Sequence, residues 1–249
     1  MRKIAVSVLC LLFSVPVFAG IVVKPFGGYT TVSMARVNSA LDGLYNSSTF
    51  DGLNKSRTNF RDAYLAGLDL GYSFIPGLDV CLRGEYIGAY SELKGKNPSP
   101  PPDNLVYSFP ADIMPVLAGV SYTYGFSGSP FSIGAEAYAG YGFAHLALTQ
   151  TEDAYDGTYS VKFTAPTYGG GFVLDSAVKF GYAISSMINL NLTAGYRQAK
   201  VSYVKSLKDT IGSSMFTFAK DEVIKGPDGK DLNLDFGGLI LNIALGLNF

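Results

Sequence analysis

Eight ionisable residues share a sequence context that would bring their charges together. Each lies in a stretch where apolar residues alternate with small or polar ones, and each falls on the polar side of that alternation. They are Lys24, Asp69, Arg83, Glu85, Glu136, Asp175, Lys179 and Arg197. Four acids and four bases would nearly neutralise one another in a confined space, where an unpaired charge is costly. The spacing predicts a salt-bridged polar interior, with a narrow or gated ion path as the alternative.

Motifs for cofactors and metals are not found in the sequence. The glycine triplet 169–171 lies in a strand-like stretch and opens no helix, so it is not a phosphate-binding loop. The segment from Gly226 to Asp231 lacks the oxygen-ligand spacing of a calcium loop and is typical of a turn. One histidine, His145, and one cysteine outside the N-terminal segment, Cys81, do not make a transition-metal site. We expect no cofactor and no metal.

The elements that would position the charged residues are β-strands. In a strand, successive side chains point to opposite faces, so an apolar face and a polar face alternate with period two. Tyr64, Leu68 and Tyr72, for example, share one parity, and Asp69 falls on the other. Eight segments are predicted as strands, near 21–35, 62–74, 78–91, 110–124, 131–149, 166–184, 188–204 and 234–249.

The connections between these segments alternate between short and long. Short turns follow the second, fourth and sixth segments, and long polar stretches occupy 36–61, 92–109, 150–165 and 205–233. This pattern predicts an all-β fold, a closed antiparallel up-and-down transmembrane β-barrel of eight strands with short periplasmic turns and long extracellular loops. Aromatic residues on the apolar faces recur eight to ten positions apart. That spacing corresponds to roughly 20–25 Å of depth, which matches the apolar band of an outer membrane.

The N-terminal stretch has the composition of an export signal. Arg2 and Lys3 precede a short apolar run that ends in Ala19, before Gly20. A basic start, a short apolar run and a small-residue cleavage site predict a signal peptide at 1–19, which leaves 20–249 as one barrel domain. Removing Arg2 and Lys3 from the 19 basic residues leaves 17 against 20 acidic ones, a net charge near −3. Such a balance gives no reason to expect nucleic acid as a partner.

The last stretch, 239–249, alternates regularly and ends on an aromatic residue. Leu245, Leu247 and Phe249 share its apolar face. It resembles the closing strand of bacterial outer-membrane β-barrels, where alternate apolar residues and a terminal aromatic are the signal that the β-barrel assembly machinery recognises. The whole of 20–249 is similar to the small eight-stranded outer-membrane proteins typified by the OmpA transmembrane domain, OmpX and OmpW. The similarity is architectural, and no motif singles out one member.

This resemblance implies an integral protein of the bacterial outer membrane, surrounded by lipid and lipopolysaccharide, with a plugged lumen and a structural or surface-presenting role. In OmpW an apolar lumen releases small hydrophobic molecules sideways into the bilayer. A narrow channel for small or hydrophobic solutes is therefore the first alternative. The charged inner faces argue against an apolar lumen in this chain.

Two further roles depend on single residues. Some eight-stranded barrels are lipid A deacylases, with a histidine, a serine two positions after it and an acid on the lipid-facing side. His145 has the outward parity, but Ala147 occupies the serine position. Enzymatic activity is therefore the weaker alternative, and we expect no catalytic residue. An extracellular ligand would instead contact large side chains of the loops, namely Tyr45, Phe50, Tyr155, Tyr159, Met215 and Phe216.

A soluble periplasmic barrel or sandwich would show the same alternation with its faces reversed. Tyr72, Leu192 and Leu245 would then share an interior, and Arg197 would face water. In a membrane barrel the three apolar side chains point outward and Arg197 points into the lumen. The direction of these side chains separates the two folds.

Overall fold

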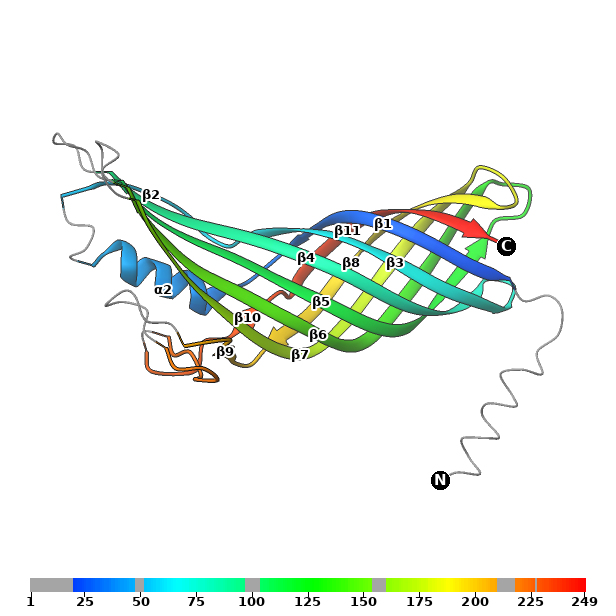
Figure 1. Cartoon of the computed structure of the whole chain (residues 1–249). Helices are drawn as coiled ribbons and strands as arrows, with labels where there is room; N and C mark the ends of the chain where they lie inside the picture. Colours follow the sequence, from blue (N-terminus) through cyan, green and yellow to red (C-terminus); the bar gives the residue numbers. More distant parts are fainter. Residues whose placement is uncertain (1–19, 48–51, 97–103, 154–159, 210–217, 227) are drawn as a thin grey trace, which may run out of the picture.

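A closed ring of eight antiparallel strands makes up most of the molecule. The computed structural model of the chain (Figure 1) describes residues 20–249 with the exception of 48–51, 97–103, 154–159, 210–217 and 227. Around the ring the strands are β1 (Ile21–Thr31), β3 (Asp62–Ile75), β4 (Leu78–Lys96), β5 (Asn104–Gly125), β6 (Phe131–Asp153), β7 (Ser160–Ala183), β8 (Ile188–Val201) and β11 (Gly238–Asn248). β11 pairs with β1 and closes the ring. The predicted eight-stranded up-and-down barrel is confirmed, and the signal peptide predicted at 1–19 lies outside the described residues.

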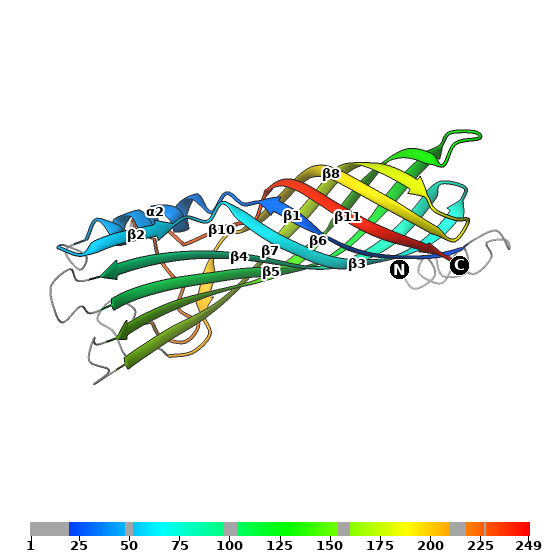
Figure 2. The same ribbon diagram turned by 90° about the horizontal axis from the view of Figure 1, so that it is seen from above.

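Shorter elements are added at one end of the ring. β2 (Asn54–Thr58) pairs with β4, β9 (Val204–Ser206) with β7, and β10 (Leu234–Asp235) with β8. The helix α2 (Ala35–Tyr45) lies at the same end. β4 to β7 are the longest strands and reach beyond the rest of the ring as a curved wall, with α2 alongside (Figures 1 and 2). We call this the long-strand end.

The opposite end, the short-turn end, carries the three tight turns. They join β3 to β4, β5 to β6 and β7 to β8. Gly77 in the first turn has φ of 84°, a left-handed conformation that glycine adopts without strain. The seam between β1 and β11 ends here in two backbone hydrogen bonds between Ile21 and Phe249, of 3.1 and 2.9 Å.

The outer face of the ring carries an apolar belt. On β4, Val80, Leu82, Tyr86 and Tyr90 point outward and are 43–53% exposed, and the next outward residue is Glu92. The belt from Val80 to Tyr90 spans ten positions. At ~3.3 Å rise per residue and ~40° tilt this is roughly 25 Å of membrane depth.

Neighbouring strands repeat this belt. Outward side chains run from Met114 to Tyr124 on β5 and from Phe172 to Tyr182 on β7, again ten positions each. Leu192 and Leu245 are 44% and 40% exposed on the outer face, whereas Arg197 is fully buried. An apolar band on a ring without open edges suits a bilayer, because an edge in lipid would leave backbone groups unpaired. The barrel is a transmembrane barrel, and the soluble alternative is wrong.

The interior changes character along each strand. From the short-turn end onward β4 presents Asp79, Arg83 and Glu85 to the lumen, then Ile87 near the outer edge of the belt and Leu93 beyond it. Where the outer face touches lipid, charged side chains can only turn inward; where the outer face touches water, apolar side chains form the core. The long-strand end therefore has an apolar core like that of a soluble β-protein. The expectation that the lumen is not apolar holds for the part of the lumen that the ion-pair clusters fill, and not for the part toward the long-strand end.

Four strands run farther than the sequence predicts. The stretches 92–109 and 150–165, expected as loops, consist largely of the long-strand ends of β4, β5, β6 and β7. Above the belt Glu92 and Lys94 point into water, while Leu93 between them is fully buried. The period-two pattern continues there with the polar residues outside, which is why those residues resemble a loop.

Other predicted strands are too long. β1 stops at Thr31, and breaks at 202–203 and 236–237 separate β8 from β9 and β10 from β11. The breaks let the chain turn away from the ring and cover the mouth of the barrel, where Val204 and Phe236 are fully buried.

The predicted loop 36–61 contains the helix α2 and the strand β2. Val37 and Leu41, one helical turn apart, are buried, as is Met34 before the helix. The helix has no side-chain cap and no acid in its first turn, so its stability comes from packing against the barrel core. Within the described residues no helix is long and apolar enough to cross a membrane.

Candidate functional site

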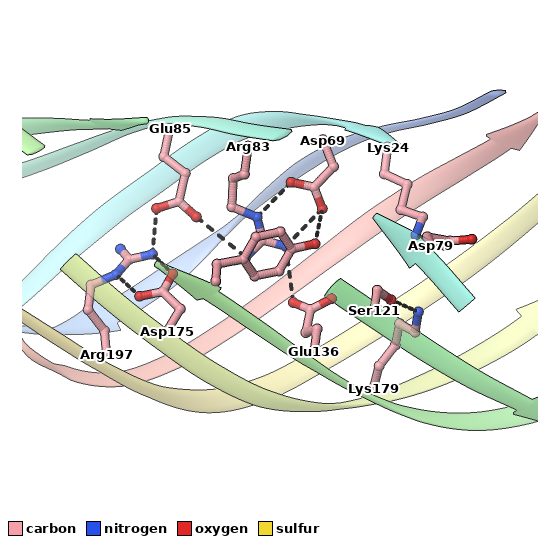
Figure 3. A network of polar contacts seen from close by, with 11 residues as sticks. Lys24, Asp69, Asp79, Arg83, Glu85, Ser121, Glu136, Asp175, Lys179 and Arg197 are labelled. Carbon is pink, nitrogen blue, oxygen red and sulfur yellow. Dashed lines mark hydrogen bonds and ion pairs between the residues drawn. The ribbon is translucent and has the colours of Figure 1, made fainter. Parts of the chain in front are cut away.

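Arg83 is the centre of one ion-pair cluster in the lumen (Figure 3). Its Nε donates to Asp69 Oδ1 at 2.6 Å, and its Nη2 donates to Asp69 Oδ2 at 2.8 Å and to Glu136 Oε1 at 3.0 Å. Asp69 lies directly opposite Arg83 in the β3–β4 register. The Tyr138 ring lies 3.7 Å from the guanidinium, and its hydroxyl donates to Asp69 at 3.1 Å. The guanidinium therefore has both a bidentate carboxylate and a ring face as partners.

Arg197 is the centre of a second cluster, closer to the long-strand end (Figure 3). Its Nε and Nη2 donate to the two carboxylate oxygens of Asp175 at 2.7 and 2.5 Å, and Nη2 also donates to Glu85. Asp175 is its register partner on β7. Glu85 joins the clusters, because its other oxygen lies 3.7 Å from Nη1 of Arg83. All of these side chains are buried.

The two lysines lie nearer the short-turn end. Lys24 Nζ donates to Asp79 Oδ2 at 2.9 Å, and Asp79 also accepts from Ser73 Oγ at 2.5 Å. Lys179 Nζ donates to Ser121 Oγ at 2.6 Å and forms no ion pair with any residue that the structure describes. Both lysines line a polar cavity of about 340 Å³ beside the tight turns.

All eight charges predicted for the lumen lie inside it, and seven of them form ion pairs with one another or with Asp79. The expected balance of four acids and four bases is wrong. Asp79 is a fifth buried acid and forms the ion pair with Lys24. Lys179 instead hydrogen-bonds to the hydroxyl of Ser121. Asp79 has the inward parity of β4, so the sequence contained that signal. The stacking of Tyr138 on Arg83 depends on the register of the strands, and no feature of the sequence indicated it.

An apolar layer lies beside the charged clusters, on the side of the long-strand end. Ile87 from β4 and its register partner Ile113 from β5 are fully buried in it, and Leu117, opposite Arg83, is buried beside the charged cluster. Leu146 from β6 and Phe236 before β11 are also fully buried. An eight-stranded ring is narrow enough for its own side chains to fill. The charged and apolar layers follow one another along the lumen.

His145 points outward from β6, immediately beyond the belt. Its Nδ1 lies 3.2 Å from Oδ1 of Asp112, its register partner on β5. Among the described residues no hydroxyl is hydrogen-bonded to His145, and Ala147 is the next outward residue of the strand. The pair supplies an imidazole and an acid at the depth of lipid headgroups, without the nucleophile that a triad requires.

The other predicted residues lie at the two ends of the barrel. Leu245 and Phe249 are exposed on the outer face at the short-turn end, and Leu247 is half-buried. Tyr45 ends α2 and packs against the core of the long-strand end. The remaining loop candidates, Phe50, Tyr155, Tyr159, Met215 and Phe216, lie outside the described residues.

The glycine triplet of β7 serves packing. A Cβ on Gly171 would lie 2.1 Å from the Lys200 carbonyl oxygen, and one on Gly170 would lie 2.4 Å from the Tyr141 hydroxyl. These glycines let neighbouring strands and rings approach closely. In the described part of the chain, no three side chains of the kinds that bind metals are grouped.

The comparisons with known proteins find similarity only at the level of structure. No family model matches the chain, and no curated protein does. The solved structure of Neisserial surface protein A is 15% identical with a TM-score of 0.34, covering 93% of this chain and 99% of that one. The outer membrane protease OmpT from Escherichia coli is 9% identical with a TM-score of 0.28, covering 93% and 96%. The translocator domain of autotransporter NalP from Neisseria meningitidis is 10% identical with a TM-score of 0.27, covering 100% and 95%. Likeness at these TM-scores carries no argument about function.

Proposed function

We propose that this chain is an integral protein of the bacterial outer membrane whose closed barrel holds a folded cap on the extracellular side. The cap consists of α2, β9, β10 and the described residues between β9 and β10, which cover the mouth of the barrel. The observation that carries the proposal is that two layers of side chains, one charged and one apolar, fill the lumen one after the other. Arg83 and Arg197 sit in buried ion-pair clusters, and Ile87 and Ile113, which are register partners, follow them with no exposed surface. A hydrated ion crossing this lumen would have to break paired charges and then enter an apolar layer.

The outer-membrane location is supported by three independent features. The N-terminal stretch 1–19 has the pattern of a signal peptide. The belt has the height and the aromatic rims of an outer-membrane barrel. Leu245, Leu247 and Phe249 carry the closing-strand pattern that resembles the recognition signal of the β-barrel assembly machinery. On this basis the short-turn end faces the periplasm, and lipopolysaccharide surrounds the outer rim.

Transport of a small apolar solute is the second candidate function. One observation favours it, an apolar pocket of about 190 Å³ in the mouth of the barrel, lined mainly by α2, by Phe109 and Leu148 of the barrel wall and by Phe218, Ile224 and Leu232. A route sideways into the bilayer would need an opening between ring strands, and every neighbouring pair in the ring is hydrogen-bonded. The pocket therefore fits a bound apolar group better than a continuous OmpW-like path.

We assign no enzymatic role. His145 and Asp112 lack a nucleophile among their described neighbours, and a histidine at the rim of a membrane barrel also serves as an interfacial polar residue. Binding of an extracellular ligand by the loops stays a proposal. Of the predicted contact residues, only Tyr45 lies in the described part of the chain.

Single-channel recording in planar bilayers tests the closed lumen. We expect no steady openings from the folded wild-type protein. We also expect none from Arg83→Ala, because the apolar layer around Ile87 and Ile113 remains in place after the cluster is broken. Mobility on gels without boiling confirms that each preparation is folded. Steady, reproducible conductance from wild-type protein would contradict the proposal and favour a channel.

A further inference from the structure

A basic depression of about 450 Å³ lies on the outer surface at the long-strand end. Its lining consists of Arg36, Lys200, Ser202, Lys230, Asp231 and Asn233. These residues come from the start of α2, the end of β8 and the segment before β10, which are far apart in sequence. None of them belongs to the lumen clusters.

Lys200 sets the height of the depression relative to the membrane. It points outward on β8, four residues beyond Tyr196 of the belt. Those four residues correspond to roughly 10 Å of height. The register of β7 and β8, with Val173 opposite Ala199, places Lys200 beside Phe172, the last belt residue of β7. The Lys200 ammonium therefore lies a short distance above the apolar edge, where lipid phosphates lie and where lysine side chains snorkel.

The two lysines of the depression are available to a ligand. Lys200 and Lys230 are exposed, and neither side chain has an ion pair or hydrogen bond within the described part of the chain. Arg36 is held in place, because its Nη1 donates to the Asp231 carbonyl at 2.8 Å and its Nη2 lies 3.5 Å from Asp228. The one carboxylate in the lining, that of Asp231, is engaged by Lys225.

The apolar surface next to the depression suits the remainder of an amphiphile. Leu239 on β11 and Tyr196 on β8 are opposite each other in register and are 65% and 51% exposed. They lie on the membrane side of Lys200. A ligand with a phosphate in the depression could place acyl chains against them, which a free phosphate ion could not do.

We propose that this depression binds the phosphate of a phosphorylated lipid of the outer leaflet, as lipopolysaccharide carries on its lipid A. The assignment rests on the outer-membrane location proposed above. A phosphate monoester has up to two negative charges and three strong acceptor oxygens. Lys200 and Lys230 match that demand with two compact, unpaired charges, and Arg36, held by Asp228 and the Asp231 carbonyl, adds positive charge beside them.

Binding of lipid A to the folded protein in detergent micelles, counted by native mass spectrometry, tests the proposal. Three probes are compared: lipid A with both phosphates, the same lipid without phosphates, and inorganic phosphate. We expect wild-type protein to bind the phosphorylated lipid about tenfold more tightly than the dephosphorylated one, as two charge-assisted contacts allow. Lys200→Gln combined with Lys230→Gln should remove that difference.

The control is Lys162→Gln combined with Lys220→Gln, which removes the same charge from exposed lysines outside the depression. It should keep the tenfold preference. The proposal is overturned if wild type shows no preference for the phosphorylated lipid, if both double variants lose the preference equally, or if inorganic phosphate at the same concentration displaces the lipid. None of these outcomes bears on the proposal of a closed lumen, because the conductance measurements test that proposal separately.

Discussion

Replacing Asp175 with leucine is expected to lower the free energy of unfolding by about 3–5 kcal/mol, the range for breaking a buried ion pair. Arg197 would lose its bidentate partner in a place where its side chain has no access to solvent. Glu85 would remain as its second partner and offset part of the loss. Urea unfolding in lipid vesicles, followed by the change in gel mobility, measures the effect.

The matched control is Ser176→Leu, one residue further along β7. Ser176 is exposed on the outer face within the belt, so leucine there would face lipid and should leave the unfolding midpoint unchanged or slightly raised. Equal loss in both variants would mean that β7 tolerates no leucine for reasons of backbone or packing. Unchanged stability of Asp175→Leu would show that the charged lumen does not depend on pairing.

Phe236→Ala is expected to loosen the extracellular cap selectively. Phe236 is fully buried in the apolar core of the long-strand end, and a buried phenylalanine truncated to alanine costs about 3–5 kcal/mol. The cap is held by apolar packing, whereas the belt is held by strand pairing and the ion clusters. We expect limited proteolysis to cut the segment between β9 and β10 far faster than in wild type, with the unboiled gel mobility of the barrel kept.

Phe180→Ala provides the comparison for this variant. Phe180 is 52% exposed on the outer face of β7, so its truncation leaves no internal cavity and should not change the rate of cutting in the cap. If Phe236→Ala abolishes the folded barrel as well, the cap and the belt unfold as one unit and the two-part description is wrong.

The facing of the strands was predictable from the sequence because period-two alternation fixes it. Leu192 and Arg197 lie where their parities place them. The strand ends were not predictable in the same way. Glu92 and Lys94 face water above the belt, and a strand whose outer face leaves lipid becomes polar outside without ending. If outward-facing charges are taken to mark a loop, the predicted strand therefore ends at residue 91, whereas β4 continues to Lys96.

The helix α2 was missed because its sequence has few local signals. Met34 at its N-terminus offers no capping side chain, and its first turn carries no acid. Its apolar stripe, Val37, Leu41 and Leu44, covers only two helical turns, and it becomes decisive when the barrel mouth is there to bury it. Such a helix is specified by tertiary packing rather than by its own propensity.

The partners within the lumen could be predicted only in part. Parity identifies which charges point inward, and a known register would pair Arg83 with Asp69 and Arg197 with Asp175, since each pair is directly opposed. Lys24 also lies opposite Asp69 but reaches Asp79 instead. Long side chains choose among several carboxylates in a narrow lumen, and sequence spacing does not resolve that choice.

Fluorescence quenching by brominated lipids tests most directly whether the apolar belt lies in the membrane. The chain contains no tryptophan, so single substitutions report one site at a time. On β4 we expect Leu82→Trp and Tyr86→Trp to be strongly quenched by bromine on the acyl chains, and Lys94→Trp, beyond the belt, to be quenched weakly. Weak quenching at Leu82 and Tyr86, or strong quenching at Lys94, would contradict the transmembrane placement of the belt.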